Sequence, residues 1–187
     1  MIDNSKLKNI QLANPFDSIS SDIRLIAMDV DGVLTDGGIY FDDLGNQTKK
    51  FNSKDGMGIR LLQKYGFEIA LISGSKSNST KARGISLDIN FIMTEVEDKH
   101  IAINKIQKIL NINPSQTIFL GDDINDLTVI PAVRMFLSPA NAHPACLKKA
   151  SWIGKCKGGE GFLREFTDLF LLSLKIDPYL EFKNQAS

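Results

Sequence analysis

The chain has 187 residues, and its 22 basic residues balance 22 acidic ones, so the formal net charge is zero. This balance argues against a nucleic-acid-binding protein, which needs a basic surface, and no apolar stretch approaches the roughly 20 residues that cross a bilayer. Two cysteines without a CxxC spacing argue against a disulfide scaffold or a zinc site. We therefore expect one cytoplasmic domain over residues 1–187, with reduced thiols and its own hydrophobic core.

Short apolar runs mark the expected strands. Residues 1–20 mix polar residues with a few apolar ones and are expected to form a loose or partly helical arm. After this arm, wholly apolar runs recur, as strands buried inside a parallel sheet require. The predicted strands are residues 24–28, 68–72, 90–93, 117–120 and 134–137.

Helical spacing of apolar residues separates these strands. The alternation predicts an α/β fold, with a parallel sheet covered by helices on both faces. A turn signal at residues 42–46 lies between two short extended runs and predicts a β-hairpin over residues 39–51, with Lys49 and Lys50 on its exposed edge. The predicted helix faces are Met57, Leu61, Leu62 and Tyr65; Ile103, Ile106 and Leu110; and Phe162, Phe166, Leu169 and Phe170.

Polar clusters follow the predicted strands. In open α/β sheets, ligands bind beyond the carboxyl ends of the strands, so these clusters are expected to meet at one edge. Several carboxylates, one ammonium and one hydroxyl suit a divalent cation and a phosphate, and oxygen ligands without His or Cys favour Mg²⁺. The clusters are Asp29-x-Asp31-Gly32-x-x-Thr35, Ser73-Gly74, Lys99 and Gly121-Asp122-Asp123-x-x-Asp126.

Each cluster also has a purely structural explanation. Asp-x-Asp-Gly is a common turn, Ser73-Gly74 fits an ordinary turn, and Lys99 fits a solvated helix face. The Gly121–Asp126 run resembles a helix N-cap with acidic first-turn residues. All four clusters in this order, each after a predicted strand, favour the phosphate site.

The four clusters resemble the motifs of the haloacid dehalogenase-like (HAD) superfamily. The resemblance implies a three-layer Rossmann-like fold and a phosphatase or mutase, with Asp29 as the nucleophile and Asp31 as the acid and then the base. It implies that Mg²⁺ is held by the Asp29 carboxylate, the Asp31 backbone carbonyl and Asp122. The resemblance also implies that Ser73 and Lys99 assist catalysis. It implies that Asp123 and Asp126 support the metal ligands, and that Thr35 and Gly74 contact the phosphate or the substrate.

Further motifs are Leu34-Thr35-Asp36-Gly37, residues 51–58, Asn141-Ala142-His143-Pro144 and residues 158–165. These motifs are similar to those of the 3-deoxy-D-manno-octulosonate 8-phosphate (KDO 8-phosphate) phosphatase family. This resemblance implies a cytoplasmic enzyme that supplies KDO for lipopolysaccharide, or a relative acting on a nine-carbon sialic-type acid phosphate. Where that family commonly has Arg, this chain has Ser75-Lys76, and lysine supplies charge without a planar two-point contact. Lys76 and Arg164 are the further expected substrate contacts.

Two alternatives to a sugar-acid phosphatase are another HAD phosphotransferase and a non-catalytic regulatory HAD module. The spacing between the motifs leaves no room for a large cap domain, and the hairpin carries exposed apolar residues. We therefore expect a homo-oligomer whose subunits cover each other's sites, and the family resemblance implies a homotetramer with paired hairpins. Residues 158–187 are expected to form a glycine-rich segment and a helix, with residues 158–165 as a mobile strip that reaches toward the substrate.

Overall fold

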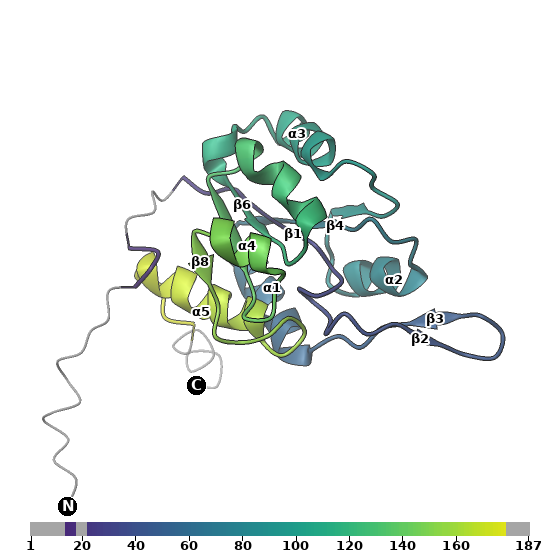
Figure 1. The fold of residues 1–187 in the computed structure, drawn as a ribbon. Coiled ribbons are helices and arrows are strands. Elements are labelled where there is room, and N and C mark those ends of the chain that lie inside the picture. Colours follow the sequence, from purple (N-terminus) through teal and green to yellow (C-terminus); the bar gives the residue numbers. More distant parts are fainter. Residues whose placement is uncertain (1–13, 18–21, 179–187) are drawn as a thin grey trace, which may run out of the picture.

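The computed structural model describes residues 14–17 and 22–178 of the chain. Its centre is a six-stranded parallel sheet in the order β5-β4-β1-β6-β7-β8 (Figure 1). This arrangement confirms the predicted α/β fold with a parallel sheet. The strands are β1 (Leu25–Met28), β4 (Glu68–Ile72), β5 (Phe91–Met93), β6 (Thr117–Leu120), β7 (Met135–Ser138) and β8 (Trp152–Ile153).

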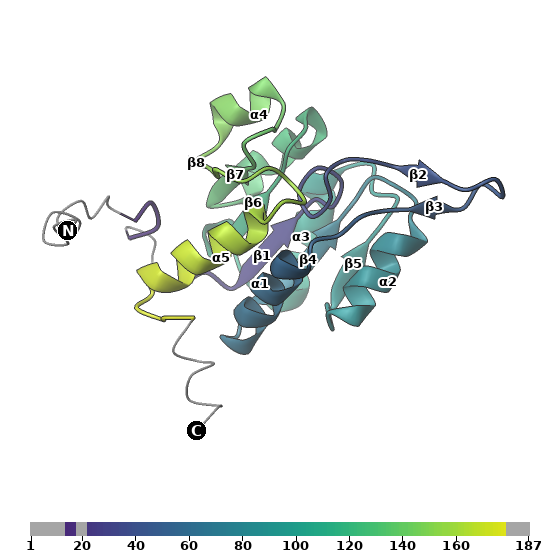
Figure 2. The same ribbon diagram turned by 90° about the horizontal axis from the view of Figure 1, so that it is seen from below.

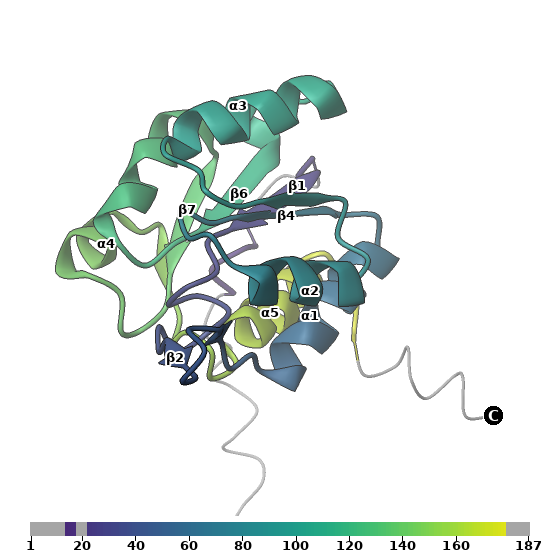
Figure 3. The ribbon, with the colours of Figure 1, turned by 90° about the vertical axis from the view of Figure 1, so that its right-hand side faces the viewer.

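Helices cover both faces of the sheet and make three layers (Figure 3). Successive residues of a strand point to opposite faces, so β1 contributes to two cores. Ile26 and Met28 lie in the core beneath α1 and α5, whereas Leu25 and Ala27 lie in the core beneath α3. The helices are α1 (Ser53–Lys64), α2 (Asn78–Ser86), α3 (Lys99–Leu110), α4 (Pro144–Lys149) and α5 (Phe162–Ser173), with 3₁₀ segments η1 (Pro114–Gln116) and η2 (Ile124–Ala132).

The predicted hairpin is present as β2 (Tyr40–Phe41) and β3 (Gln47–Thr48), which pair antiparallel. It extends away from the body of the molecule next to α2 (Figures 1 and 2). Among the described residues, the hairpin and α1 are the only elements between β1 and β4, so no large cap domain interrupts the fold. Within the same residues, no helix combines the length and apolarity of a membrane span.

One expectation about packing is wrong, and one buried residue was not predicted. Met57 is exposed, although the rest of its predicted helix face packs inward. Phe16, within the expected arm, is fully buried, and its ring meets Trp152, Phe166 and Phe170 edge-on. Residues 1–13 and 18–21 lie outside the described residues.

Candidate active site

Asp29 and Lys99 meet because Asp29 points to the face of the sheet that α3 covers, and Lys99 is the first residue of α3. Asp29 continues β1, its backbone N–H donating to the Leu120 carbonyl, and its position alternates onto the face that carries Leu25, Ala27 and α3. Helix α3 begins at Lys99 after the N-cap Asp98. The Lys99 Nζ lies 2.6 Å from Asp29 Oδ1 and 2.6 Å from Asp126 Oδ1. Lys99 is 2% exposed, so this ammonium is a buried cation held by two carboxylates.

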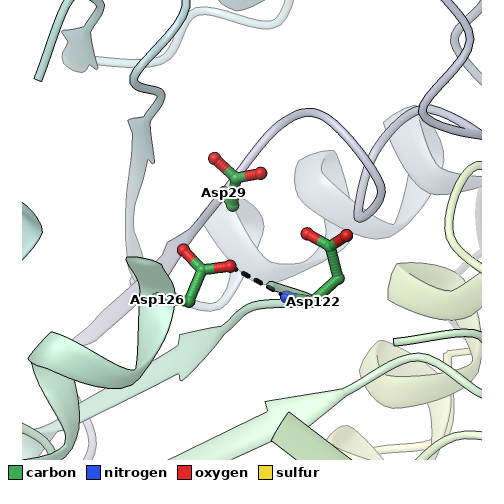
Figure 4. Close-up of side chains that lie close together, drawn as sticks. All are labelled: Asp29, Asp122 and Asp126. Carbon is green, nitrogen blue, oxygen red and sulfur yellow. Dashed lines mark hydrogen bonds between the residues drawn. The ribbon is translucent and has the colours of Figure 1, made fainter. Parts of the chain in front are cut away.

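Three carboxylates form a cluster at this edge. Asp29, Asp122 and Asp126 each place an oxygen within 4.8 Å of the other two, and Figure 4 shows the three side chains together. Asp126 is fully buried and already bonded, since Oδ1 accepts from Lys99 and Oδ2 accepts the backbone N–H groups of Asp122 and Asp123. The hydrogen bonds of Asp126 therefore orient its neighbours, and Asp29 and Asp122 are the members with oxygens available to a metal ion.

The cluster carries more negative charge than its lysine balances. Burial raises the pKa of Asp29 to about 6, against the opposing effect of Lys99 and with a further increase from Asp126. Burial, followed by the charges of Asp29 and Asp126, raises the pKa of Asp122 to about 8. Burial favours neutral Lys99, but Asp29 and Asp126 outweigh it and raise the pKa of the ammonium. Carboxylates with raised pKa values bind either protons or a cation, and an all-oxygen donor set suits Mg²⁺.

The loop after β1 is shaped by a glycine and a buried threonine. Gly32 has a φ of +89°, and a Cβ there would lie 2.0 Å from Asp122 Oδ2, so only glycine fits between the two motifs. The Thr35 hydroxyl accepts from the N–H groups of Gly32 and Gly37 at 3.4 and 3.2 Å. Thr35 is fully buried, so its side chain supports the loop from inside.

Lys49 was missed by the sequence prediction, which placed it on an exposed hairpin edge. Its side chain is 0% exposed, and its Nζ lies 2.7 Å from Asp31 Oδ2, whereas the side chain of Lys50 is 63% exposed. The prediction is wrong for Lys49 and correct for Lys50. Neighbouring residues in an extended segment face opposite sides, but two adjacent lysines give no sequence signal of which one points inward.

The second motif lies one strand away from Asp29. Ser73 follows β4, the neighbour of β1 in the sheet, and is buried with its Oγ accepting from the Ser75 N–H at 3.1 Å. Gly74 is exposed beside it. The structure does not bring Lys76 to the carboxylate cluster as a contact: its side chain is 83% exposed, with Nζ 3.8 Å from Glu95.

Gly158 and Gly159 pack against the loop after β1 (residues 30–36, the catalytic loop), and the expectation of a mobile strip over residues 158–165 is wrong. Gly158 and Gly159 are buried, and the Gly159 N–H donates to the Val33 carbonyl at 2.9 Å. A Cβ on Gly158 would lie 1.6 Å from the Gly32 carbonyl oxygen. Close backbone packing, which only glycines allow, therefore fixes this segment.

The motif at residues 51–58 forms hydrogen bonds with Gly159 and with the first turn of α5. Asn52 Nδ2 donates to the Gly159 carbonyl at 3.2 Å, and Asp55 Oδ1 accepts the backbone N–H of Arg164 at 2.9 Å. The Arg164 guanidinium bonds instead to Asp168, with Nε 2.8 Å from Oδ1. The motif at residues 51–58 and the motif at residues 158–165 are thus partners in packing.

Comparisons with known proteins agree with this geometry. Residues 70–166 match the haloacid dehalogenase-like hydrolase family. The 3-deoxy-D-manno-octulosonate 8-phosphate phosphatases of Yersinia pestis and of Escherichia coli K12 are 37% and 36% identical over 154 residues, which is 82% of each chain.

Solved structures show the same similarity. The crystal structure of the Yersinia pestis phosphatase superposes with a TM-score of 0.83 at 35% identity, over 86% of this chain and 87% of that one. The Moraxella catarrhalis 3-deoxy-D-manno-octulosonate 8-phosphate phosphatase, in complex with a magnesium ion, a phosphate ion and KDO, superposes with a TM-score of 0.85 at 30% identity, over 94% and 99% of the two chains. The four motifs, the three-layer fold and these relatives together establish that the chain belongs to the haloacid dehalogenase-like hydrolase family.

Proposed function

We propose that this chain is a Mg²⁺-dependent phosphatase that hydrolyses KDO 8-phosphate to KDO and inorganic phosphate. The carrying observation is the cluster in which Lys99 bridges Asp29 and Asp126 beside Asp122. The phosphatases that resemble this chain over most of its length support the choice of substrate. The active-site carboxylates and lysine also favour an enzyme over a non-catalytic module.

The reaction proceeds in two half-reactions on the chain's own residues. A bond forms between an Asp29 carboxylate oxygen and phosphorus while the bond from phosphorus to the sugar oxygen breaks, and Asp31 gives its proton to the departing oxygen. Water then attacks phosphorus, Asp31 takes up the proton of that water, and the bond to Asp29 breaks to release inorganic phosphate. Lys99 stabilises the charge of the phosphoryl oxygens throughout.

The metal-ligand set is the Asp29 carboxylate, the Asp31 backbone carbonyl and the Asp122 carboxylate. The raised pKa values of Asp29 and Asp122 fit this assignment, because a bound cation would offset the repulsion between the two groups. When bound, Mg²⁺ supplies positive charge that offsets repulsion between the nucleophile and the phosphate dianion. Asp126 supports the Asp122 segment by accepting the backbone N–H groups of Asp122 and Asp123, and the Asp123 carboxylate caps the start of η2.

Substrate contacts come from the rim of the site. The Ser73 hydroxyl and the Gly74 amide donate to phosphate oxygens, and the Thr35 loop borders the same space. Lys76 and Arg164 contact the sugar acid in the bound state, Lys76 by leaving Glu95 and Arg164 by leaving Asp168. Both side chains are accessible enough for such a change.

The enzyme acts in the cytoplasm as a homotetramer on a small sugar-acid phosphate, without nucleic-acid or membrane partners. The exposed apolar side chains of the hairpin support assembly, since several such side chains on a narrow projection favour burial against another subunit. They are Ile39, Tyr40, Phe41 and Leu44. The product, KDO, places the reaction in lipopolysaccharide synthesis.

A panel of phosphate esters tests the substrate assignment. Phosphate release is measured with Mg²⁺ from KDO 8-phosphate, from a nine-carbon sialic-type acid 9-phosphate and from simple sugar phosphates. We expect KDO 8-phosphate to give the highest kcat/KM. A higher kcat/KM for the nine-carbon acid phosphate would show that this compound, and not KDO 8-phosphate, is the substrate. The comparison is needed because this chain has Lys76 where the family commonly has arginine.

A further inference from the structure

The second buried lysine of the catalytic edge comes from the hairpin. Lys49 directly follows β3, and its fully buried Nζ lies 2.7 Å from Asp31 Oδ2 and 3.5 Å from Thr80 Oγ1. An ammonium loses its hydration when it is buried, so lysines are almost never fully buried unless they are paired. Asp31 is the charged partner that compensates for the burial of Lys49.

The two oxygens of Asp31 have different surroundings. Oδ2 accepts from Lys49, whereas Oδ1 is buried and accepts no hydrogen bond from the described residues. A buried acceptor without a donor is unfavourable and marks an atom available to a ligand or a proton. The contact with Lys49 therefore fixes which oxygen is occupied and which is left for the reaction.

The two lysines also separate the carboxylates of the site. Lys99 contacts Asp29 and Asp126, and Lys49 contacts Asp31. Asp31 is only two residues from Asp29, so a cation bound there would attract its side chain as well. Lys49 gives the Asp31 carboxylate a competing partner of opposite charge 2.7 Å away, and this attraction draws the carboxylate toward the base of the hairpin.

We infer that Lys49 is a positioning residue that holds the Asp31 carboxylate so that Oδ1 transfers the proton to and from the substrate. This inference rests on the proposed role of Asp31. The hairpin base is itself anchored, since Ser79 Oγ at the start of α2 donates to the Gln47 carbonyl at 3.0 Å. The hairpin thus contributes directly to the geometry of its own subunit's active site.

The test compares two aryl phosphates that differ in the leaving group. Phenolate is more basic than 4-nitrophenolate and needs a proton as it leaves, so loss of the proton donor lowers kcat/KM more for phenyl phosphate. We expect Lys49→Met to lower the ratio of the two kcat/KM values, phenyl over 4-nitrophenyl, by about tenfold, and Asp31→Asn to lower it further. The control Lys50→Met, next to it on the exposed side, should change the ratio by less than about twofold.

Combined variants separate this inference from the proposed function. Adding Lys49→Met to Asp31→Asn should change the ratio no further, because both act through one group, and Lys49→Arg should recover most of the ratio by retaining the charge. If Asp31→Asn lowers the ratio but Lys49→Met behaves like Lys50→Met, the positioning role of Lys49 is overturned and the role of Asp31 stands. If Asp31→Asn leaves the ratio unchanged, both assignments fall. Circular dichroism checks that each variant is folded. If Lys49→Met is unfolded, the ratio of kcat/KM values is measured for Lys49→Gln instead.

Discussion

Asp122 opposes folding in the absence of a cation. Its pKa is raised to about 8 by burial and by neighbouring carboxylates, so its ionised form is less stable in the folded chain than in the unfolded chain. Asp122→Asn removes that charge and keeps the shape. At pH 8 without Mg²⁺, we expect this variant to gain at least about 1 kcal/mol, which raises Tm by roughly 2–4 °C.

The same variant should lose the response of Tm to Mg²⁺, because ligands that bind only the folded state stabilise it. Thermal melts without Mg²⁺ and at Mg²⁺ concentrations that rise in tenfold steps measure both effects. The matched control is Asp43→Asn, at an exposed hairpin position outside the site. An Asp122→Asn protein that melts lower than wild type without metal and still responds to Mg²⁺ would contradict the assigned metal site.

At the residue scale, the sequence predicts the carboxylate cluster because each member follows a buried strand and parallel strands end at one edge. Asp29, Asp122, Asp126 and Lys99 therefore meet as expected. Lys49 could not be predicted, because its inward direction depends on the tertiary contacts of its Nζ with Asp31 and Thr80 rather than on any local pattern.

The glycine segment before α5 controls the catalytic loop at the element scale. Gly158→Ala would force its methyl group into the Gly32 carbonyl, and backbone cannot rotate away as a side chain can. We expect a loss of about 1–3 kcal/mol in the free energy of unfolding, as for other overpacked sites, together with a lower kcat. The measurements are a denaturant titration and a steady-state assay.

Glu160→Ala, in the same segment but exposed, is the control and should remain within about 0.5 kcal/mol of wild type. Wild-type stability and kcat in Gly158→Ala would show that the contact with the loop is unimportant.

The elements differ in how well the sequence predicts them. Strands β4 and β6 begin and end at the predicted residues, because each apolar run starts at a polar residue and stops before a small one. Helix α2 was not predicted, since only Thr80 and Gly84 of its nine residues are buried and it lacks an apolar stripe. Residues 158–161 were misjudged because glycines permit either mobility or close packing, and tertiary contacts decide between them.

Assembly belongs to the scale of the whole molecule. If hairpins join the subunits, sedimentation velocity should give a tetramer of the 20.7 kDa chain at micromolar concentration. The double substitution Phe41→Ser and Leu44→Ser, at the exposed hairpin, should shift the protein to smaller species because it removes apolar surface from the interface. The control is Ile109→Ser, on the exposed face of α3.

A monomeric wild-type protein would contradict the proposed tetramer. A hairpin variant that remains tetrameric would show that the subunits meet through another surface.

For the whole molecule, alternation of strands and helices predicts the three layers, whereas the burial of Phe16 could not be predicted. A single aromatic residue in a polar segment has no periodicity, and its partners Trp152, Phe166 and Phe170 are more than 130 residues away in sequence.

The central claim is that Asp29 attacks the phosphate of KDO 8-phosphate in a Mg²⁺-dependent reaction. The most direct measurement is the release of inorganic phosphate from KDO 8-phosphate by wild type and Asp29→Asn, each with Mg²⁺ and with a chelator. We expect release by wild type with Mg²⁺ only, and less than about 1% of that rate from folded Asp29→Asn, because an amide cannot serve as the nucleophile. Substantial turnover by Asp29→Asn, or equal turnover by wild type in the chelator, would contradict the account.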